Sequence, residues 1–223
     1  MRWRKSTGVC LTLILLTVAI AGQAADRRTW VKTRWVVDGD TIVLADGQHV
    51  RYIGIDTPEI EHREQPAEPM GDQAGSVNRQ LVDGWQLRLV YDREKKDRYG
   101  RTLAFVYRSD GLFVNAELLK RGCAFVLYRF PNTANKAILL SAQREAMGQG
   151  RGIWAHVDKA DHPFQAYLGN RRSRRFHAHD CKMGQKISRK NRVRFENQWA
   201  AFWAGYAPAR ECIAFPAKAS GLK

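Results

Sequence analysis

The fold of this chain is decided by residues 38–59, which read DGDTIVLADGQHVRYIGIDTPE. Val- and Ile-rich runs lie on both sides of Asp46–Gly47, a strong signal for a tight hairpin turn. A hairpin of this length sets Asp40 and Asp56 at the ends of two joined strands, with Arg51 between them. The stretch therefore predicts two carboxylates and a guanidinium gathered around one point.

The residue types in this stretch indicate a metal site. Two aspartates brought close together, here Asp40 and Asp56, repel each other unless a cation lies between them. Thr57 precedes a proline, which holds its backbone extended and leaves its carbonyl oxygen available as a ligand. Two carboxylates, a carbonyl and water form a flexible set of oxygen ligands, which favours Ca²⁺ over a softer metal.

Two arginines and a third acidic residue complete the predicted chemistry. Arginine side chains bind phosphate oxygens and stabilise the charge that builds up there during reaction, and Arg51 and Arg101 are the candidates. Glu59 lies three residues past Asp56, where it can hold a water molecule. An Asp-Gly-Asp sequence alone is usually a turn, and an isolated arginine is more often a surface ion-pair partner. Their ordered co-occurrence favours metal-assisted hydrolysis of a phosphodiester.

The rest of the first 157 residues predicts an α+β fold. Short strands separated by few helices are typical of a small closed barrel with helices packed against it. Asn115 is the expected cap of the second helix and Gly122 its stop. The expected strands are 34–37, 41–45, 50–55, 86–92, 102–107 and 124–128, and the expected helices are 71–82, 116–121 and 135–147.

Four motifs resemble the staphylococcal nuclease (thermonuclease) family. They are Val37–Thr41, Arg51–Glu59, Asp97–Arg101 and Asn115–Leu119. The resemblance covers about residues 30–157. It implies a five-stranded OB-fold barrel with about three helices, and Ca²⁺-dependent cleavage of DNA and RNA.

The resemblance also implies a role for each matching residue. Asp40, Asp56 and the Thr57 carbonyl would bind Ca²⁺, and Glu59 would act as general base or water organiser. Arg51 and Arg101 would bind the phosphate. Tyr99 and Tyr128 match substrate-binding tyrosines, whereas Phe130 stands where the family has a second tyrosine near the nucleotide, so a hydroxyl is missing there.

The first 24 residues have the pattern of a secretory signal peptide. Arg2, Arg4 and Lys5 precede an apolar run of 13 residues, Val9 to Ala21, and small residues follow it. The run is short of the roughly 20 residues that span a bilayer. We expect cleavage near Ala24 or Ala25, with an uncleaved anchor as the alternative. The mature protein would be exported, periplasmic or secreted, with no transmembrane segment.

The C-terminal third differs in composition. Residues 158–170 predict a linker and residues 171–216 a basic, cysteine-containing module with a short helix. Residues 158–223 contain 14 basic and 5 acidic side chains, out of a formal net charge of +15 for the chain. Such a tail predicts a polyanionic partner, because binding phosphates releases counterions; a solvated tail is the alternative.

The module resembles a degenerate form of the small zinc module of Ada-type repair proteins, which uses four cysteines. Cys181 and Cys212 match cysteine positions, and Ala209 stands at a third. Two cysteines do not complete a structural zinc site, although His177 and His179 offer nitrogens. In an oxidising compartment we expect a Cys181–Cys212 disulfide, in preference to free thiols. Bound zinc is not expected.

Taken together, the sequence predicts an exported Ca²⁺-dependent nuclease with little sequence specificity. The alternative from another class is a non-catalytic OB-fold protein of the envelope that binds nucleic acid. The full set of acidic residues and arginines favours the enzyme. A third interpretation gives the basic tail an anionic polymer or lipid as its main partner.

Overall fold

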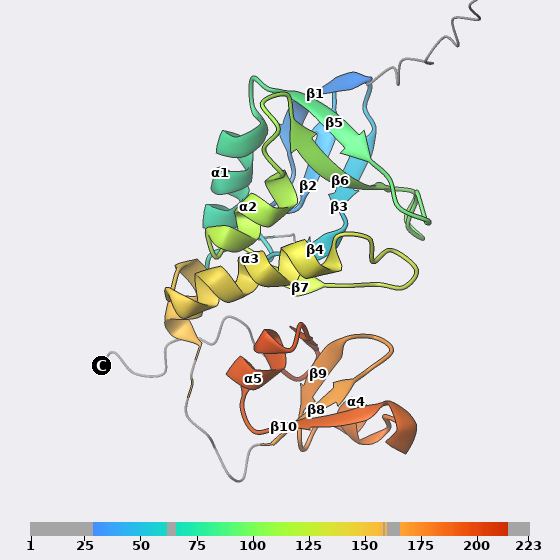
Figure 1. Cartoon of the computed structure of the whole chain (residues 1–223), viewed down its shortest axis with the longest axis vertical. Helices are drawn as coiled ribbons and strands as arrows, with labels where there is room; N and C mark the ends of the chain where they lie inside the picture. The colour runs from blue at the N-terminus through green and yellow to red at the C-terminus, as the bar shows by residue number, and fades with distance from the viewer. Residues whose placement is uncertain (1–28, 62–65, 158, 160–165, 214–223) are drawn as a thin grey trace, which may run out of the picture.

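The computed structural model describes residues 29–61, 66–157, 159 and 166–213. The predicted signal peptide and most of the predicted linker lie outside these residues. Figure 1 shows three layers, with a barrel at the top, a long helix and a short sheet in the middle, and a small module at the bottom. Within the described residues, no helix has both the length and the apolar character that crossing a membrane requires.

The barrel confirms the predicted fold class. It is closed by five strands in the order β1-β2-β3-β6-β5, all pairs antiparallel except the parallel β3–β6 pair. Alternating apolar residues of these strands fill its interior, among them Ile42, Val50 and Val106, which are fully buried. The strands are β1 Trp30–Val36, β2 Thr41–Leu44, β3 His49–Tyr52, β5 Gln86–Val90 and β6 Thr102–Arg108.

One predicted strand is in fact two. The run 50–55 breaks at Gly54, whose φ of 82° favours glycine, and a Cβ there would lie 2.5 Å from Cδ1 of Leu139. After this break the chain leaves the barrel as β4 (Gly54–Asp56), which pairs with β7 (Phe125–Leu127) in a separate two-stranded sheet. The bend turns Asp56 back towards the start of β2.

Three longer helices pack beside the barrel, at the predicted positions. They are α1 Gly71–Val82, α2 Val114–Lys120 and α3 Lys136–Gly148. The predicted cap of α2 was wrong, because Asn115 lies inside the helix. Its buried amide accepts from the Val106 N–H and donates to the Ile53 carbonyl, which ties α2 to the barrel.

The C-terminal module, residues 166–213, forms its own four-stranded sheet in the order β10-β8-β9-β11. Residues 167–170, which the sequence places in the linker 158–170, form the first strand of the module, β8. The module therefore begins before the predicted boundary at residue 171. Its elements are β8 Tyr167–Asn170, β9 Arg175–Ala178, α4 Lys182–Gln185, the 3₁₀ turn η2 Arg189–Asn191, β10 Arg192–Phe195, α5 Gln198–Trp203 and β11 Ala207–Pro208. A further 3₁₀ turn, η1 (Gly152–His156), follows α3 and precedes the module.

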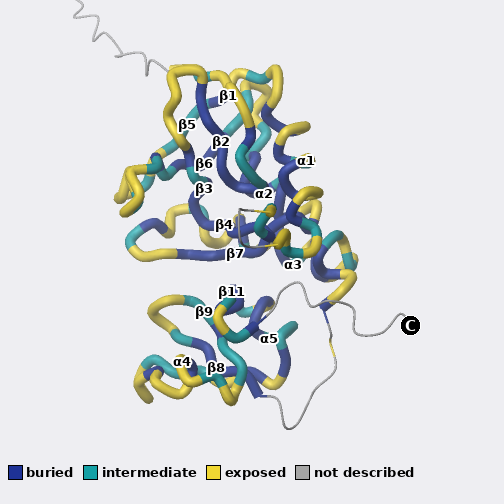
Figure 2. Tube along the Cα trace, turned by 180° about the vertical axis from the view of Figure 1, so that it is seen from behind, coloured by how far each residue is buried: buried dark blue, intermediate teal, exposed yellow. Residues whose placement is uncertain are grey.

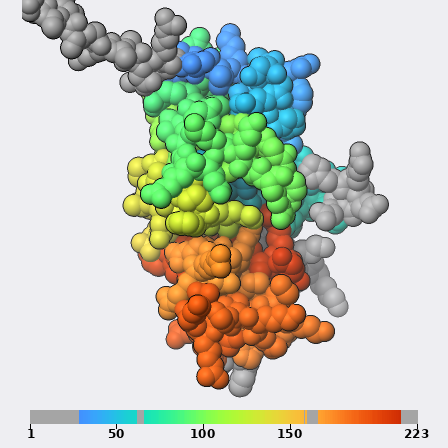
Figure 3. Space-filling view, turned by 90° about the vertical axis from the view of Figure 1, so that its right-hand side faces the viewer, coloured from blue at the N-terminus to red at the C-terminus, as the bar shows by residue number. Residues whose placement is uncertain are grey.

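The module is docked on the barrel domain through a shared apolar core. The fully buried Phe202 of α5 packs edge-on against Trp154 of η1, with ring centroids 5.0 Å apart. The Gln143 amide of α3 accepts from the Val126 N–H and donates to the Phe202 carbonyl, both at 2.6 Å. Figures 2 and 3 show buried chain on both sides of this junction and one continuous surface over it. The docking fixes where the module's side chains fall relative to the barrel.

Candidate active site

Asp40 and Asp56 meet at one point, as the hairpin predicts, with Arg51 between them. The Arg51 Nη2 atom lies 3.0 Å from Asp40 Oδ2 and 2.7 Å from Asp56 Oδ1. Arg51 Nη1 donates to the carbonyls of Tyr52 and Ile55, each at 2.9 Å, so the bend after β3 fixes the guanidinium. Because all three side chains are buried or nearly so, their charges act in a medium of low dielectric.

The Asp40 carboxylate is further held by Thr57. The backbone N–H of Thr57 donates to Asp40 Oδ2 at 3.0 Å, and its hydroxyl lies 3.2 Å from the same oxygen. Burial raises the pKa of Asp40 well above its ordinary value, and the neighbouring Arg51 opposes the rise. A cation bound at this point would favour the ionised form.

Glu59 lies at the rim of the same cluster. Its backbone N–H donates to Glu68 Oε2 at 2.9 Å, and its carbonyl accepts from the Glu68 N–H at 2.8 Å. Burial raises the pKa of Glu59, and Arg210 partly offsets this rise. A carboxylate with a raised pKa beside an open cleft has the properties of a proton acceptor.

The cluster opens into a cleft of about 500 Å³ that is lined by the barrel, by the β5–β6 loop and, from the C-terminal module, by Arg175 and Arg210. Arg101 lines this cleft and pairs with Asp97, with 2.7 Å between Nε and Oδ2. Tyr99 lines it too and is 68% exposed, with the guanidinium groups of Arg98 and Arg101 at 4.7 and 5.6 Å from its ring centroid. Tyr128 is not among the lining residues, because it is buried and its hydroxyl donates to the Lys136 carbonyl at 2.6 Å.

Two residues that sequence reasoning missed come from the C-terminal module. Arg210 Nη1 lies 3.1 Å from Asp56 Oδ2 and 3.1 Å from Glu59 Oε1. Arg175 Nη2 lies 3.3 Å from the same Asp56 oxygen. Nothing in the local sequence around either arginine marks it as a site residue, since each reaches the cleft only through the docking of the module.

The oxygen atoms present fit a hard divalent cation. The Thr57 carbonyl lies beside Asp56, since Arg210 donates to this carbonyl from Nη2 at 2.7 Å and contacts Asp56 Oδ2 through Nη1 at 3.1 Å. The guanidinium groups of Arg51 and Arg210 already contact these oxygens. Carboxylate and carbonyl oxygens are the ligands that Ca²⁺ prefers. Asp40, Asp56 and Thr57 are therefore the residues that would hold it.

A second cluster lies within the module, away from the cleft. Cys181 and Cys212 are free thiols, and each sulfur lies 3.6 Å from Nδ1 of His177. The three ligand atoms lie within 4.8 Å of one another. This closeness is compatible with the predicted disulfide and with the alternative of a soft metal, so both stay open.

An OB-type barrel whose cleft sets buried carboxylates against arginines is the architecture of a phosphodiester-cleaving enzyme. A sequence model described as "Staphylococcal nuclease homologue" matches residues 49–156. The thermonuclease of Staphylococcus intermedius is 42% identical over 122 residues, which cover 53% of this chain and 72% of that protein. The thermonuclease of Staphylococcus hyicus is 37% identical over 135 residues, 59% of this chain and 79% of that protein.

The chain belongs to the staphylococcal nuclease family, and it is a nuclease. A third relative, Endonuclease YncB of Bacillus subtilis (strain 168), is 39% identical over 124 residues, 53% of this chain and 58% of that protein. The C-terminal module, residues 166–213, lies beyond the residues that the family model matches.

Proposed function

We propose that this protein is an exported, Ca²⁺-dependent nuclease that hydrolyses DNA and RNA with little sequence specificity. The observation that carries the proposal is the meeting of Asp40 and Asp56 around Arg51, with 3.0 and 2.7 Å to the guanidinium. Nucleic acid is the substrate class because phosphate is the group that the arginines of the cleft recognise.

Hydrolysis forms a bond between a water oxygen and phosphorus and breaks the bond from phosphorus to a sugar oxygen, which takes up a proton from solvent as it leaves. Bound Ca²⁺ would supply neutralisation of the phosphate charge and a lower pKa for water. Glu59 takes the proton of the attacking water, for which its raised pKa suits it. Arg51 and Arg101 hold the phosphate oxygens and stabilise the added negative charge.

Substrate binding uses the exposed part of the cleft. The exposed ring of Tyr99, flanked by the guanidinium groups of Arg98 and Arg101, would stack on a base, and such contacts do not distinguish sequence. Phosphate and base stacking are common to DNA and RNA, so recognition through these two groups supports cleavage of both. Tyr128 would act in substrate binding only indirectly, by shaping the wall behind the cleft.

The test is digestion of plasmid DNA and of a structureless RNA with Ca²⁺ or with EGTA. Wild type should cut both with Ca²⁺ and neither with EGTA, and Glu59→Gln should lose activity by about 100- to 10,000-fold. Glu145→Gln, on α3 and outside the cleft, should stay within twofold of wild type. Tight binding of both nucleic acids without cleavage would favour a non-catalytic binder instead.

The proposed export rests on the N-terminal pattern of basic residues followed by 13 apolar ones. Cell fractionation followed by N-terminal sequencing tests it. A mature chain that starts near Ala25, found in the periplasm or the medium, supports export. A full-length chain in the cytoplasm contradicts it.

A further inference from the structure

Arg210 of the C-terminal module has its guanidinium on the oxygens that would bind the metal. Nη1 lies 3.1 Å from Asp56 Oδ2, and Nη2 donates to the Thr57 carbonyl at 2.7 Å. Nε and Nη2 also reach Glu68, at 2.9 and 3.3 Å. One fully charged side chain thus contacts two of the three expected ligands and two neighbouring acidic residues.

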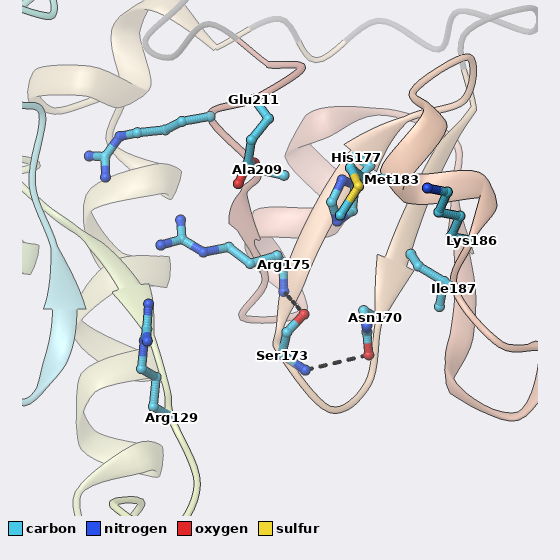
Figure 4. Close-up of a pocket in the computed structure, with 11 residues that line it drawn as sticks. Arg129, Asn170, Ser173, Arg175, His177, Met183, Lys186, Ile187, Ala209 and Glu211 are labelled. Atoms are coloured by element: carbon cyan, nitrogen blue, oxygen red, sulfur yellow. Dashed lines mark hydrogen bonds between the residues drawn. The ribbon is translucent and has the colours of Figure 1, made fainter. Parts of the chain in front are cut away.

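The backbone of the module fixes this position. Arg210 follows β11, which is paired in parallel with β9. The Ala209 N–H donates to the Phe176 carbonyl at 2.8 Å, and Ile213 lies buried in the shared apolar core. Arg175 supports the segment by donating to the Pro208 carbonyl at 2.7 Å, while its other nitrogen contacts Asp56. Figure 4 shows Arg175 extending from the module towards the barrel side, where Arg129 lies.

A divalent cation and this guanidinium compete for the same atoms. Ca²⁺ takes six to eight oxygen ligands at about 2.3–2.6 Å, so a bound ion needs Asp56 and the Thr57 carbonyl turned towards it. An arginine that donates to the same oxygens would then lie only a few ångströms from a divalent charge. Repulsion at that distance in a partly buried site is strong.

We propose that Arg210 competes with the divalent cation for Asp56 and the Thr57 carbonyl, so that the C-terminal module sets the metal affinity of the nuclease. Ca²⁺ binding displaces the arginine, whose retained contacts with Glu68 keep it beside the cleft. Coupling between two binding events is reciprocal. The contact of Arg210 with Asp56 and Thr57 therefore lowers the affinity for Ca²⁺, and bound Ca²⁺ weakens that contact to the same degree. This inference rests on the proposed function.

Calorimetric titration of Ca²⁺ into the full-length protein tests the competition directly, without substrate. Arg210→Ala should bind Ca²⁺ about tenfold more tightly than wild type, as expected if the engaged arginine outnumbers the free one by ten to one. Arg210→Lys, which keeps the charge but loses the planar fork, should show a smaller gain. Arg194→Ala removes the same charge from the exposed side of β10 and should change affinity less than twofold.

The outcomes separate this inference from the proposed function. If wild type binds one Ca²⁺ and Arg210→Ala binds it equally or more weakly, the competition is refuted and the metal-dependent nuclease stands. If no variant binds Ca²⁺, both fail.

A second measurement uses only the wild-type protein and covers the case in which Arg210→Ala does not fold. Phenylglyoxal modifies accessible guanidinium groups, and the Arg210 side chain is 29% exposed. Peptide mass spectrometry should find Arg210 modified several-fold faster in Ca²⁺ than in EGTA, with Arg194 unchanged. Equal rates for Arg210 would refute the displacement.

Discussion

Arg210 Nη1 lies 3.1 Å from Asp56 Oδ2, although 154 positions separate the two residues in the chain. The C-terminal module is therefore part of the active-site wall and not a detached basic tail. Truncation at residue 158 would remove this contact and would also uncover Trp154 and the apolar face of β7. Single substitutions are the better probes of the module.

Removing the second phosphate-binding arginine should reduce turnover. Arg101→Ala should lower kcat by about 100- to 1000-fold, because one donor to the developing charge is lost. Arg101→Lys keeps the positive charge but loses the planar guanidinium that binds two phosphate oxygens, so it should retain only part of the wild-type kcat. Steady-state kinetics on a defined oligonucleotide measures both. A drop confined to KM, with kcat unchanged, would show that Arg101 only binds the substrate.

The ionised, buried carboxylate of Asp40 should lower the free energy of unfolding when no metal is bound. Its pKa is raised in the folded state by burial, with Arg51 in opposition, so the folded protein binds this proton more tightly than the unfolded chain does. The free energy of unfolding should then fall as pH rises from the ordinary aspartate pKa, about 3.9, through the folded value.

Asp40→Asn removes that buried charge and keeps an oxygen for the Thr57 N–H. In EGTA at neutral pH the variant should be more stable than wild type, and its advantage should shrink as the pH is lowered. Urea unfolding at several pH values measures the difference. A variant less stable than wild type at neutral pH would mean that the ion pair with Arg51 outweighs burial.

Exposed basic residues of the module should strengthen nucleic-acid binding without regard to sequence. Arg172 and Lys186 line hollows next to the cleft, on its module side. Arg172→Ala or Lys186→Ala should each reduce the slope of log affinity against log salt by about 0.7–0.9, one phosphate contact. Binding is measured in EGTA by fluorescence anisotropy, with Arg79→Ala on α1 as the control. Unchanged slopes would favour a tail that is only solvated.

The thiol cluster of the module offers a clear choice between two chemistries. A Cys181–Cys212 disulfide should appear by mass spectrometry of the unreduced exported protein as a loss of about two hydrogens in mass. Alkylation of both Cys181 and Cys212 without reduction, together with no bound metal, would exclude the predicted disulfide and the alternative metal site. Zinc recovered in a one-to-one ratio, and lost in a His177→Ala variant, would instead establish a metal site.

The sequence predicted the centre of the site because that centre is local. Asp40 precedes the β2–β3 hairpin, Arg51 lies in it and Asp56 follows it at the end of β4, so a turn signal and the strand patterns suffice to bring them together. The break at Gly54 was missed, since an apolar run looks continuous until its contact with Leu139 on α3 is known. The interpretation of Asn115 as a cap was wrong for a similar reason, because its amide hydrogen-bonds Val106 of β6 and the Ile53 carbonyl, which lies 62 positions earlier in the chain.

The module's part in the site was beyond sequence reasoning. Strand β8 was hidden because a short run with glycine and polar flanks resembles a linker. Arg210 reaches Asp56 only after Phe202 and Gln143 have docked the module on α3 and β7. Contacts that depend on such packing produce no pattern of apolar and polar residues in the sequence from which they could be predicted.

The most direct test is Ca²⁺ binding measured beside cleavage for wild type, Asp40→Asn and Asp56→Asn. The account predicts one ion per wild-type chain, a stabilisation of about 2.7 kcal/mol at a Ca²⁺ concentration of 100 Kd, and loss of both binding and cleavage in each variant. Cleavage that persists in EGTA, or a variant that still binds Ca²⁺ as tightly as wild type, would contradict it.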